Sequence, residues 1–133
     1  MATEPTRYIT YAEAVLIHVV VMRYFGESHF GVDDRALIES ALARSKHAAT
    51  YENADIVRQA ATLCFGLIKN HPWVGGNKRT ATVIVNEFLK RNGFVLAASI
   101  AEALELVLAV EADQWKVDEI ENRLRQHTTQ IET

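Results

Sequence analysis

The chain has very few of the residues that form covalent or metal cross-links. Its 133 residues include one cysteine, Cys64, and five histidines. A single cysteine excludes an internal disulfide, so the chain fits a reducing compartment. Because Cys64 lies on an apolar stripe and no two histidines are spaced i, i+4, we expect a core cysteine and no structural metal site.

The chain also lacks a basic excess, a signal-like start and an apolar run of membrane length. Its net charge is -3, which argues against general affinity for nucleic acids or membranes. The start MATEPTRYITYAEA lacks the basic and then apolar pattern of a signal peptide. The apolar run AEAVLIHVVVM contains His18 and is well short of a membrane span. We therefore expect a soluble cytoplasmic protein with no nucleic-acid or membrane partner.

Local start and stop signals predict six helices in one compact, bundle-like all-α domain over residues 1–133. The signals are capping boxes at Thr10 and Ser99, acidic N-caps, basic last turns, and glycines just past helix ends. The expected helices cover residues 10–25, 33 or 34 to 43, 54–70, 77–92, 99–110 and 117–127. Residues 27–32 and 45–53 are expected to be irregular. The run of three valines at 19–21 is β-like by propensity and leaves a strand as the alternative there.

The segment NHPWVGGNKRTA, residues 70–81, is the stretch that points to chemistry. A helix N-terminus has unpaired N–H groups and a partial positive charge, so it binds anions, phosphate above all. Gly75 and Gly76 precede such a terminus and let the backbone approach a ligand. Asn77 can cap the helix or donate its amide to a phosphate oxygen, and Lys78 and Arg79 add two full charges.

His71 adds a candidate general base. Pro72 disfavours the α conformation at His71, so the chain is expected to break there and to lift the imidazole out of the preceding helix. A neutral histidine beside a phosphate site can take the proton of a hydroxyl nucleophile. The pattern thus favours group transfer from a nucleotide to a hydroxyl. Each feature alone also has a plainer interpretation: a His-Pro turn, a tight glycine turn, an N-cap and two solvated cations.

The sequence HPWVGGNKRTA resembles the signature of the Fic/Doc (Fido) family, which is His-Pro-Phe-x-acid-Gly-Asn, then Gly or Lys, then Arg. Its Asn-Lys-Arg-Thr-Ala ending resembles the Doc (death-on-curing) branch. The segments LIESALAR, AATLCFGLIKNHPW and EFLKRNGF also resemble Doc-like proteins. The resemblance covers roughly residues 8 to 127. It implies an all-helical fold in which the loop and helix at 71–92 lie at the centre.

The resemblance implies specific roles for the matching residues. His71 matches the base that takes a proton from the target hydroxyl. Asn77 and the backbone of residues 75–79 match the loop that holds the phosphates of ATP or another nucleoside triphosphate. Arg79 matches the arginine that clamps a phosphate.

Other motif positions bear on loop packing and on the type of transfer. Pro72 and Trp73 match packing positions, although the family has Phe where Trp73 stands. Thr82 replaces a second arginine of the adenylyl-transferring members, and Lys78 replaces a glycine that they use to approach the phosphates. The lysine version goes with the kinase-like Doc branch, so we favour phosphoryl transfer, with AMP transfer on the same scaffold as the alternative.

The motif departs from the family at Gly75. The family has Asp or Glu there to hold the Mg²⁺ that bridges the nucleotide phosphates, and glycine offers no ligand. Three explanations are open. Gly75 is an engineered inactivating change, the protein is a non-catalytic binding member, or another carboxylate, such as Glu52 or Asp55, holds the metal.

The resemblance also implies two kinds of protein partner. Tyr51 and Glu52 precede the third expected helix, where family members use a flap, and are candidate contacts for the target protein. The family's inhibitory Ser/Thr-x-x-x-Glu motif is not matched, since Ala48 precedes Glu52 by four positions and Thr133, not Gly or Asn, follows Glu132. We therefore expect a separate small antitoxin that lays an amphipathic helix in a hydrophobic groove, and a translation component as target.

Overall fold

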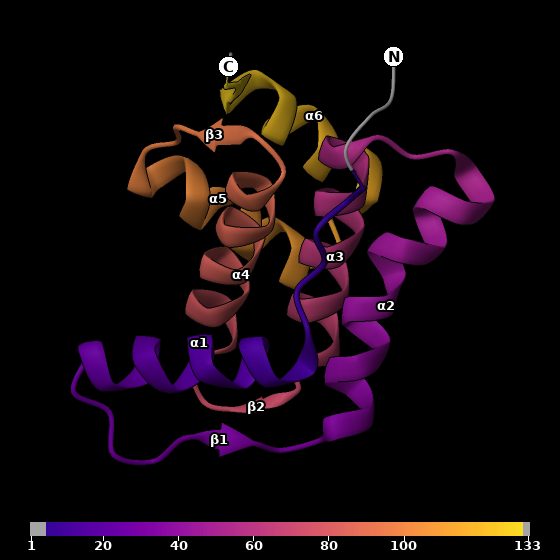
Figure 1. Ribbon diagram of the computed structural model, residues 1–133. Coiled ribbons are helices and arrows are strands. Elements are labelled where there is room, and N and C mark those ends of the chain that lie inside the picture. The colour runs from indigo at the N-terminus through magenta and orange to yellow at the C-terminus, as the bar shows by residue number, and fades with distance from the viewer. Residues whose placement is uncertain (1–4, 132–133) are drawn as a thin grey trace.

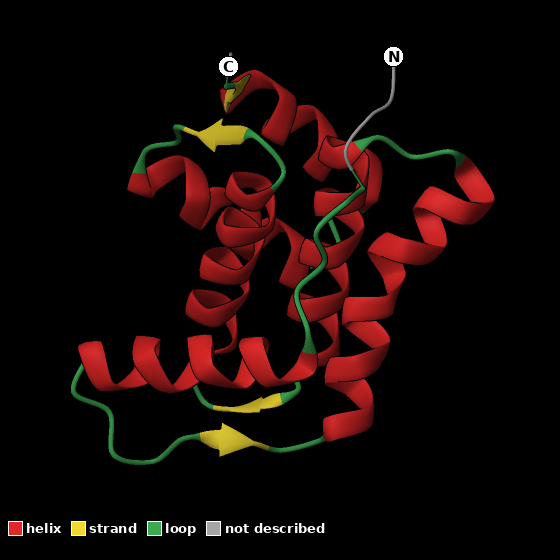
Figure 2. Cartoon of the chain, viewed as in Figure 1, coloured by secondary structure: helices red, strands yellow, loops and turns green. Residues whose placement is uncertain are grey.

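A computed structural model describes residues 5–131 as one compact domain of six helices with two pairs of short strands (Figures 1 and 2). The helices are α1 Tyr11–Tyr24, α2 Arg35–Glu52, α3 Ile56–Asn70, α4 Asn77–Arg91, α5 Ile100–Glu111 and α6 Val117–His127. The strands are β1 Gly31–Val32, β2 Trp73–Val74, β3 Phe94–Leu96 and β4 Thr128–Gln130. The domain is predicted over residues 1–133. Its residues 1–4 and 132–133 lie outside the described range, and so does Glu132 of the unmatched inhibitory motif.

The predicted caps form where the sequence placed them. Thr10 makes a complete capping box at the start of α1, and Ser99 makes another at the start of α5. The Asp34 side chain accepts the backbone N–H of Leu37 and caps α2. These contacts satisfy N–H groups that a helix start leaves unpaired, and they confirm the three helix starts that local signals predicted.

Tertiary packing overrides the local signals in two segments. The prediction of irregular structure at residues 45–53 is wrong, because α2 continues to Glu52 before Asn53 ends it in a left-handed conformation at φ 54°. The reason is tertiary: Ser45 and Ala48 extend the buried stripe begun by Ile38 and Ala41. The three valines at 19–21 are helical, so packing overrides their β propensity there.

The core gathers around α3, which lies between α2 and α4 in Figure 1 and also packs on α6. The apolar face of α3 is fully buried, and facing side chains of α4 and α6 complete the core. The largest fully buried side chains of these three helices are Leu63, Leu67, Ile68, Ile84, Phe88, Leu89 and Ile120. Helix α1 crosses below the lower ends of α3 and α4, so it closes the end of the core at which the residue 70–77 segment lies (Figure 1).

The short strands were not expected from the sequence. β1 and β2 pair antiparallel, with Gly31 opposite Val74 and Val32 opposite Trp73, while β3 pairs with β4. The first pair ties the 70–77 segment to the connection between α1 and α2. Within the described residues, no helix is both long and apolar enough to cross a membrane.

A candidate anion-binding site at the start of helix α4

The turn that carries His71 begins where α3 ends. Asn70 is the last helical residue, and His71 takes a left-handed conformation at φ 47° and ψ 54°. The carbonyl of Pro72 accepts the backbone N–H groups of Asp33 and Asp34, which anchors the turn. The predicted break at His71 is therefore present, and the His71 side chain is 55% exposed.

Two consecutive glycines set the path of the backbone into α4. Gly75 and Gly76 have φ of +70° and +63°, in the region where side chains other than Asn, Asp and His are uncommon. A Cβ on Gly76 would clash with the Sδ of Met22, so a side chain there would also force the end of the Met22 side chain to move. A Cβ on Gly75 would meet its nearest atom, Met22 Cε, at an ordinary 3.5 Å.

Asn77 holds the loop together from the inside. Its Oδ1 accepts the backbone N–H of Trp73, and its Nδ2 donates to the Trp73 carbonyl, both at 2.9 Å. Asn77 is thus the first residue of α4, and Gly76 is the N-cap. No side chain caps this helix start and no acidic residue lies in its first turn. The first N–H groups of α4 therefore remain available to an anion.

A polar cavity of about 320 Å³ lies at this helix start. Its lining brings together most of the residues that the sequence singled out, with one addition: His71, Gly76, Asn77, Lys78, Arg79 and Glu111. Gly75 is not part of the lining. The cavity thus combines a histidine, a helix N-terminus and two cations, a set that suits a phosphate-bearing ligand.

Glu111 is the residue that the sequence did not indicate. It is the last residue of α5, more than thirty positions after the loop, and its carboxylate lies 2.9 Å from Lys78 Nζ and 3.3 Å from His71 Nε2. In the sequence Glu111 ends an apolar run and has no motif around it. Only the packing of α5 beside α4 brings it to the cavity.

Arg79 points toward the end of α1. Its guanidinium lies 4.6 Å from the centre of the Phe25 ring and its Nη2 lies 3.4 Å from Glu27 Oε1. Stacking on an aromatic ring orients the guanidinium plane without using all of its donors. Arg79 can therefore still offer N–H groups to an anion in the cavity.

A buried histidine packs against the loop from the side of α1. His18 of α1 is fully buried, stacks on Trp73 at 4.4 Å between ring centres, and lies 2.8 Å from Thr80 Oγ1. Its Nε2 accepts the Gly31 N–H, so Nδ1 carries the proton and donates to Thr80. Burial lowers the pKa of His18, which favours this neutral form. The sequence-based interpretation of His18 as a packed histidine is confirmed.

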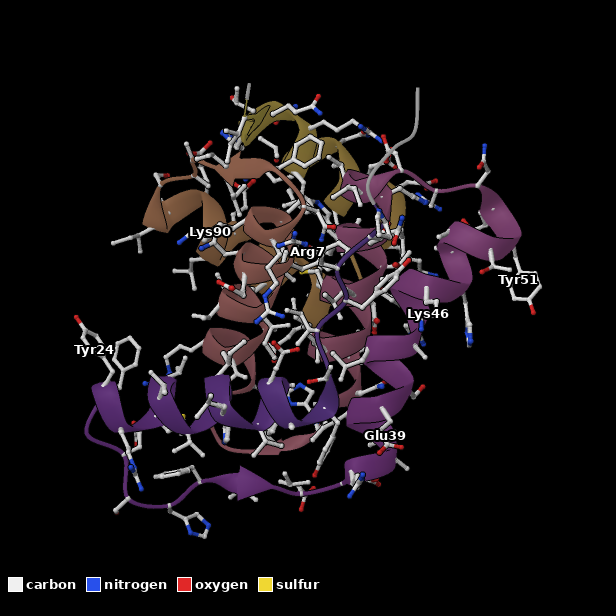
Figure 3. The ribbon with its side chains drawn as sticks, in the orientation of Figure 1. Arg7, Tyr24, Glu39, Lys46, Tyr51 and Lys90 are labelled. Atoms are coloured by element: carbon white, nitrogen blue, oxygen red, sulfur yellow. The ribbon has the colours of Figure 1, made fainter. Side chains whose placement is uncertain are left out.

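Three other predicted residues lie away from the cavity. Tyr51 and Glu52 end α2 near the start of α3, whereas His71 follows its other end, and a helix of 15 residues is about 22 Å long. Figure 3 shows the Tyr51 side chain on the outside of the C-terminal end of α2. Asp55 caps α3 and forms an ion pair with Arg125. Neither carboxylate reaches the loop, so neither can replace a motif acid.

The residues at the cavity do not fit a bound Mg²⁺. Gly75 has no side chain, and the described part of the chain holds no cluster of three or more acidic, histidine or cysteine residues suited to a metal. The carboxylate of Glu111 already contacts an ammonium group at 2.9 Å, which repels a divalent cation. Cys64 offers no nucleophile either, since burial raises its pKa to about 12.

Comparison with known proteins agrees with the motif. A family model described as the Fic/DOC family matches residues 8–89, which include α1 to α3, the cavity loop and most of α4. No curated protein matches the chain. Members of the Fic/DOC family are typically protein-modifying transferases that use nucleoside triphosphates. Because the match spans more than half of the 133 residues, the chain belongs to the Fic/DOC family.

Proposed function

We propose that this protein is a Doc-like toxin of a toxin–antitoxin pair. It acts in the cytoplasm and transfers the terminal phosphoryl group of a nucleoside triphosphate to a Ser or Thr hydroxyl of a host protein, with a translation component as the expected target class. The observation that carries the proposal is the cavity that joins His71 to the uncapped first turn of α4, with Lys78 and Arg79 at its wall.

The residues divide the chemical work as follows. The N–H groups at the start of α4, with Lys78 and Arg79, hold the phosphates and neutralise their charge. The target hydroxyl oxygen forms a bond to the terminal phosphorus as the bond from that phosphorus to the bridging oxygen breaks. The nucleoside diphosphate leaves with the electron pair of the broken bond. His71 takes the proton that the hydroxyl loses.

Two residues favour phosphoryl transfer over AMP transfer. In the adenylyl-transferring members that the motif resembles, a glycine stands at the position of Lys78. Lys78 instead places an ammonium group there, and its Nζ reaches Glu111 in the cavity. Thr82 donates its hydroxyl to the Lys78 carbonyl at 2.9 Å, so it offers no substitute for the phosphate-binding arginine of adenylyl-transferring members. AMP transfer on the same scaffold is the alternative.

Gly75 supports a second candidate function. Without a motif acid, and with no fitting metal site in the described residues, the protein can be a disabled member that binds nucleotide or partner without turnover. Gly75→Asp restores the family's carboxylate at a position where a Cβ meets nothing closer than 3.5 Å. Aspartate also tolerates the left-handed backbone better than most residues.

The test is label transfer from ATP into proteins of a bacterial lysate in the presence of Mg²⁺. The chain, Gly75→Asp and Gly75→Asp with His71→Ala are compared, each with γ-labelled and with α-labelled ATP. A γ-labelled band with the unaltered chain supports the kinase. A band with Gly75→Asp alone supports the disabled member, and an α-labelled band supports AMP transfer. No band from any variant refutes the transferase proposal, as does a band that survives His71→Ala.

We also propose the surface that the antitoxin covers. An apolar groove of about 360 Å³ runs between α4 and α5, from Ile100 and Leu104 to Lys78 and Arg79 at the cavity. Ile100 is 89% exposed and Leu104 is 51% exposed. The occupant that fits is an amphipathic helix with apolar residues along the groove and an acidic residue facing the two cations. A helix seated there also closes one side of the cavity.

The partner proposal is tested with the small protein encoded beside this chain. Leu104→Asp places a charge in the groove, whereas Leu16→Asp places one on the outer face of α1, where Leu16 is 62% exposed. We expect co-purification to be lost with Leu104→Asp and kept with Leu16→Asp. Equal binding by both variants would place the partner elsewhere.

A further inference from the structure

The acidic residue of the cavity contacts both of its chemically active neighbours. One carboxylate oxygen of Glu111 lies 2.9 Å from Lys78 Nζ, and the other lies 3.3 Å from His71 Nε2. The Glu111 side chain is only 25% exposed, compared with 45% for Lys78 and 55% for His71. The Glu111 carboxylate therefore lies between His71, the candidate base, and Lys78, the candidate phosphate-binding cation. It is also less exposed to solvent than either of these side chains.

The location of Glu111 is unfavourable for its own helix. It is the last residue of α5, where the helix dipole places partial negative charge, and no basic residue of α5 lies in that last turn to offset it. Compensation comes from across the cavity, from Lys78 in the first turn of α4, where the dipole is positive. Helix stability thus gives no reason for the carboxylate to be here.

The other cation of the cavity is balanced in the same way. Arg79 lies 3.4 Å from Glu27, in the connection after α1. Both cations that line the cavity thus have a glutamate beside them. An anion that enters must compete with these two carboxylates, and with Glu111 first, since it is the one that lines the cavity.

We propose that Glu111 is a built-in counter-ion that keeps the cavity in a low-affinity state for polyanions, by occupying Lys78 and His71 until the ligand or a bound partner displaces it. This inference rests on the proposed function, since it assumes that the cavity receives phosphates. Displacement frees two groups at once, the Lys78 ammonium for the phosphates and the His71 imidazole for the target hydroxyl. Glu111 acts through these two residues and is a positioning residue.

The experiment measures binding of inorganic triphosphate by calorimetry, with the whole chain and no nucleotide. Glu111→Gln removes the charge and keeps the shape of the side chain, and Glu111→Ala removes the contact as well. The matched control is Glu105→Gln, a change of the same type on α5, because Glu105 pairs with Arg123 and does not line the cavity. Circular dichroism checks that each variant is folded.

We expect both Glu111 variants to bind triphosphate about fivefold to tenfold more tightly than the unaltered chain, the effect of one unit charge next to a polyanion in a half-exposed site. Glu105→Gln should bind as the unaltered chain does. Equal or weaker binding by the Glu111 variants overturns the inference, and so does an absence of triphosphate binding in every variant. Failure of the transfer assay, with tighter triphosphate binding by Glu111→Gln, would refute the transferase proposal and leave the counter-ion in place.

Discussion

Replacing His18 with leucine should destabilise the protein through the loop that it supports. Leucine has a similar volume, so the change removes polar contacts and stacking without opening a large cavity. The part-buried Gly31 N–H and the buried Thr80 hydroxyl both lose their partner, at up to about 1–3 kcal/mol for each group left unpaired. Loss of the stack on Trp73 adds about 0.5–1.5 kcal/mol. The Thr80 oxygen loses only an incoming donor and its hydroxyl can still donate its own proton, so the Gly31 N–H and the lost stack dominate and we expect a total of about 2–4 kcal/mol.

The same residue predicts a pH dependence of stability. His18 is held neutral in the fold, with a pKa below the usual 6.5, because burial penalises its charged form. Above about pH 6.5 both folded and unfolded chains carry this histidine neutral, and its full contribution is present. As the pH falls toward the folded pKa, the unfolded chain binds the proton first, so stability is lost at up to about 1.4 kcal/mol per pH unit.

The assay is urea unfolding at about pH 8 and about pH 5.5, followed by far-ultraviolet circular dichroism. The unaltered chain should exceed His18→Leu in free energy of unfolding at the higher pH, and the gap should shrink by up to about 1 kcal/mol at the lower pH. His47→Leu, at an exposed position of α2, is the control and should change stability by less than about 0.5 kcal/mol. A gap that is constant with pH would refute the buried neutral histidine.

Three further predictions concern the loop and the core. Gly76→Ala should cost about 1–3 kcal/mol in urea unfolding, since φ is positive and the added Cβ displaces the end of the Met22 side chain, and an unchanged midpoint would contradict the loop geometry. Asn77→Ala should cost about 1–3 kcal/mol and weaken triphosphate binding, because both backbone groups of Trp73 lose their partner; calorimetry checks the second effect. Cys64 should not react with an aromatic disulfide reagent in the folded protein and should react fully in urea, and rapid native reaction would show that its burial is incomplete.

Much of the helical framework could be read from short-range signals. A capping box joins residues three positions apart and needs no long-range contact, so α1 and α5 begin where the sequence indicated. The last helix has the predicted bounds, Val117–His127. The loop at residues 70–77 could also be identified from the sequence, because its histidine and glycines and the cations that follow are close together in the chain.

Local signals failed where a long-range contact decides the outcome. Residues 45–53 look irregular because they contain no large aliphatic side chain to continue the apolar stripe of Leu37, Ile38 and Leu42, yet Ser45 and Ala48 are buried and keep α2 helical. The short strand pairs could not be predicted for the same reason. Pairing of β1 with β2 joins segments about forty residues apart, and neither segment is long enough to show a strand pattern.

The sequence by itself determined most of the helix bounds, the family and the residues of one loop, because each of these depends mainly on residues that are close together in the chain. Only the tertiary structure decided what surrounds that loop. The packing of α5 beside α4 brings Glu111 to Lys78 and His71, and the passage of α1 across the end of α4 places His18 against Trp73. The physical reason is that charge interactions and burial depend on distance in space, which the order of residues does not record.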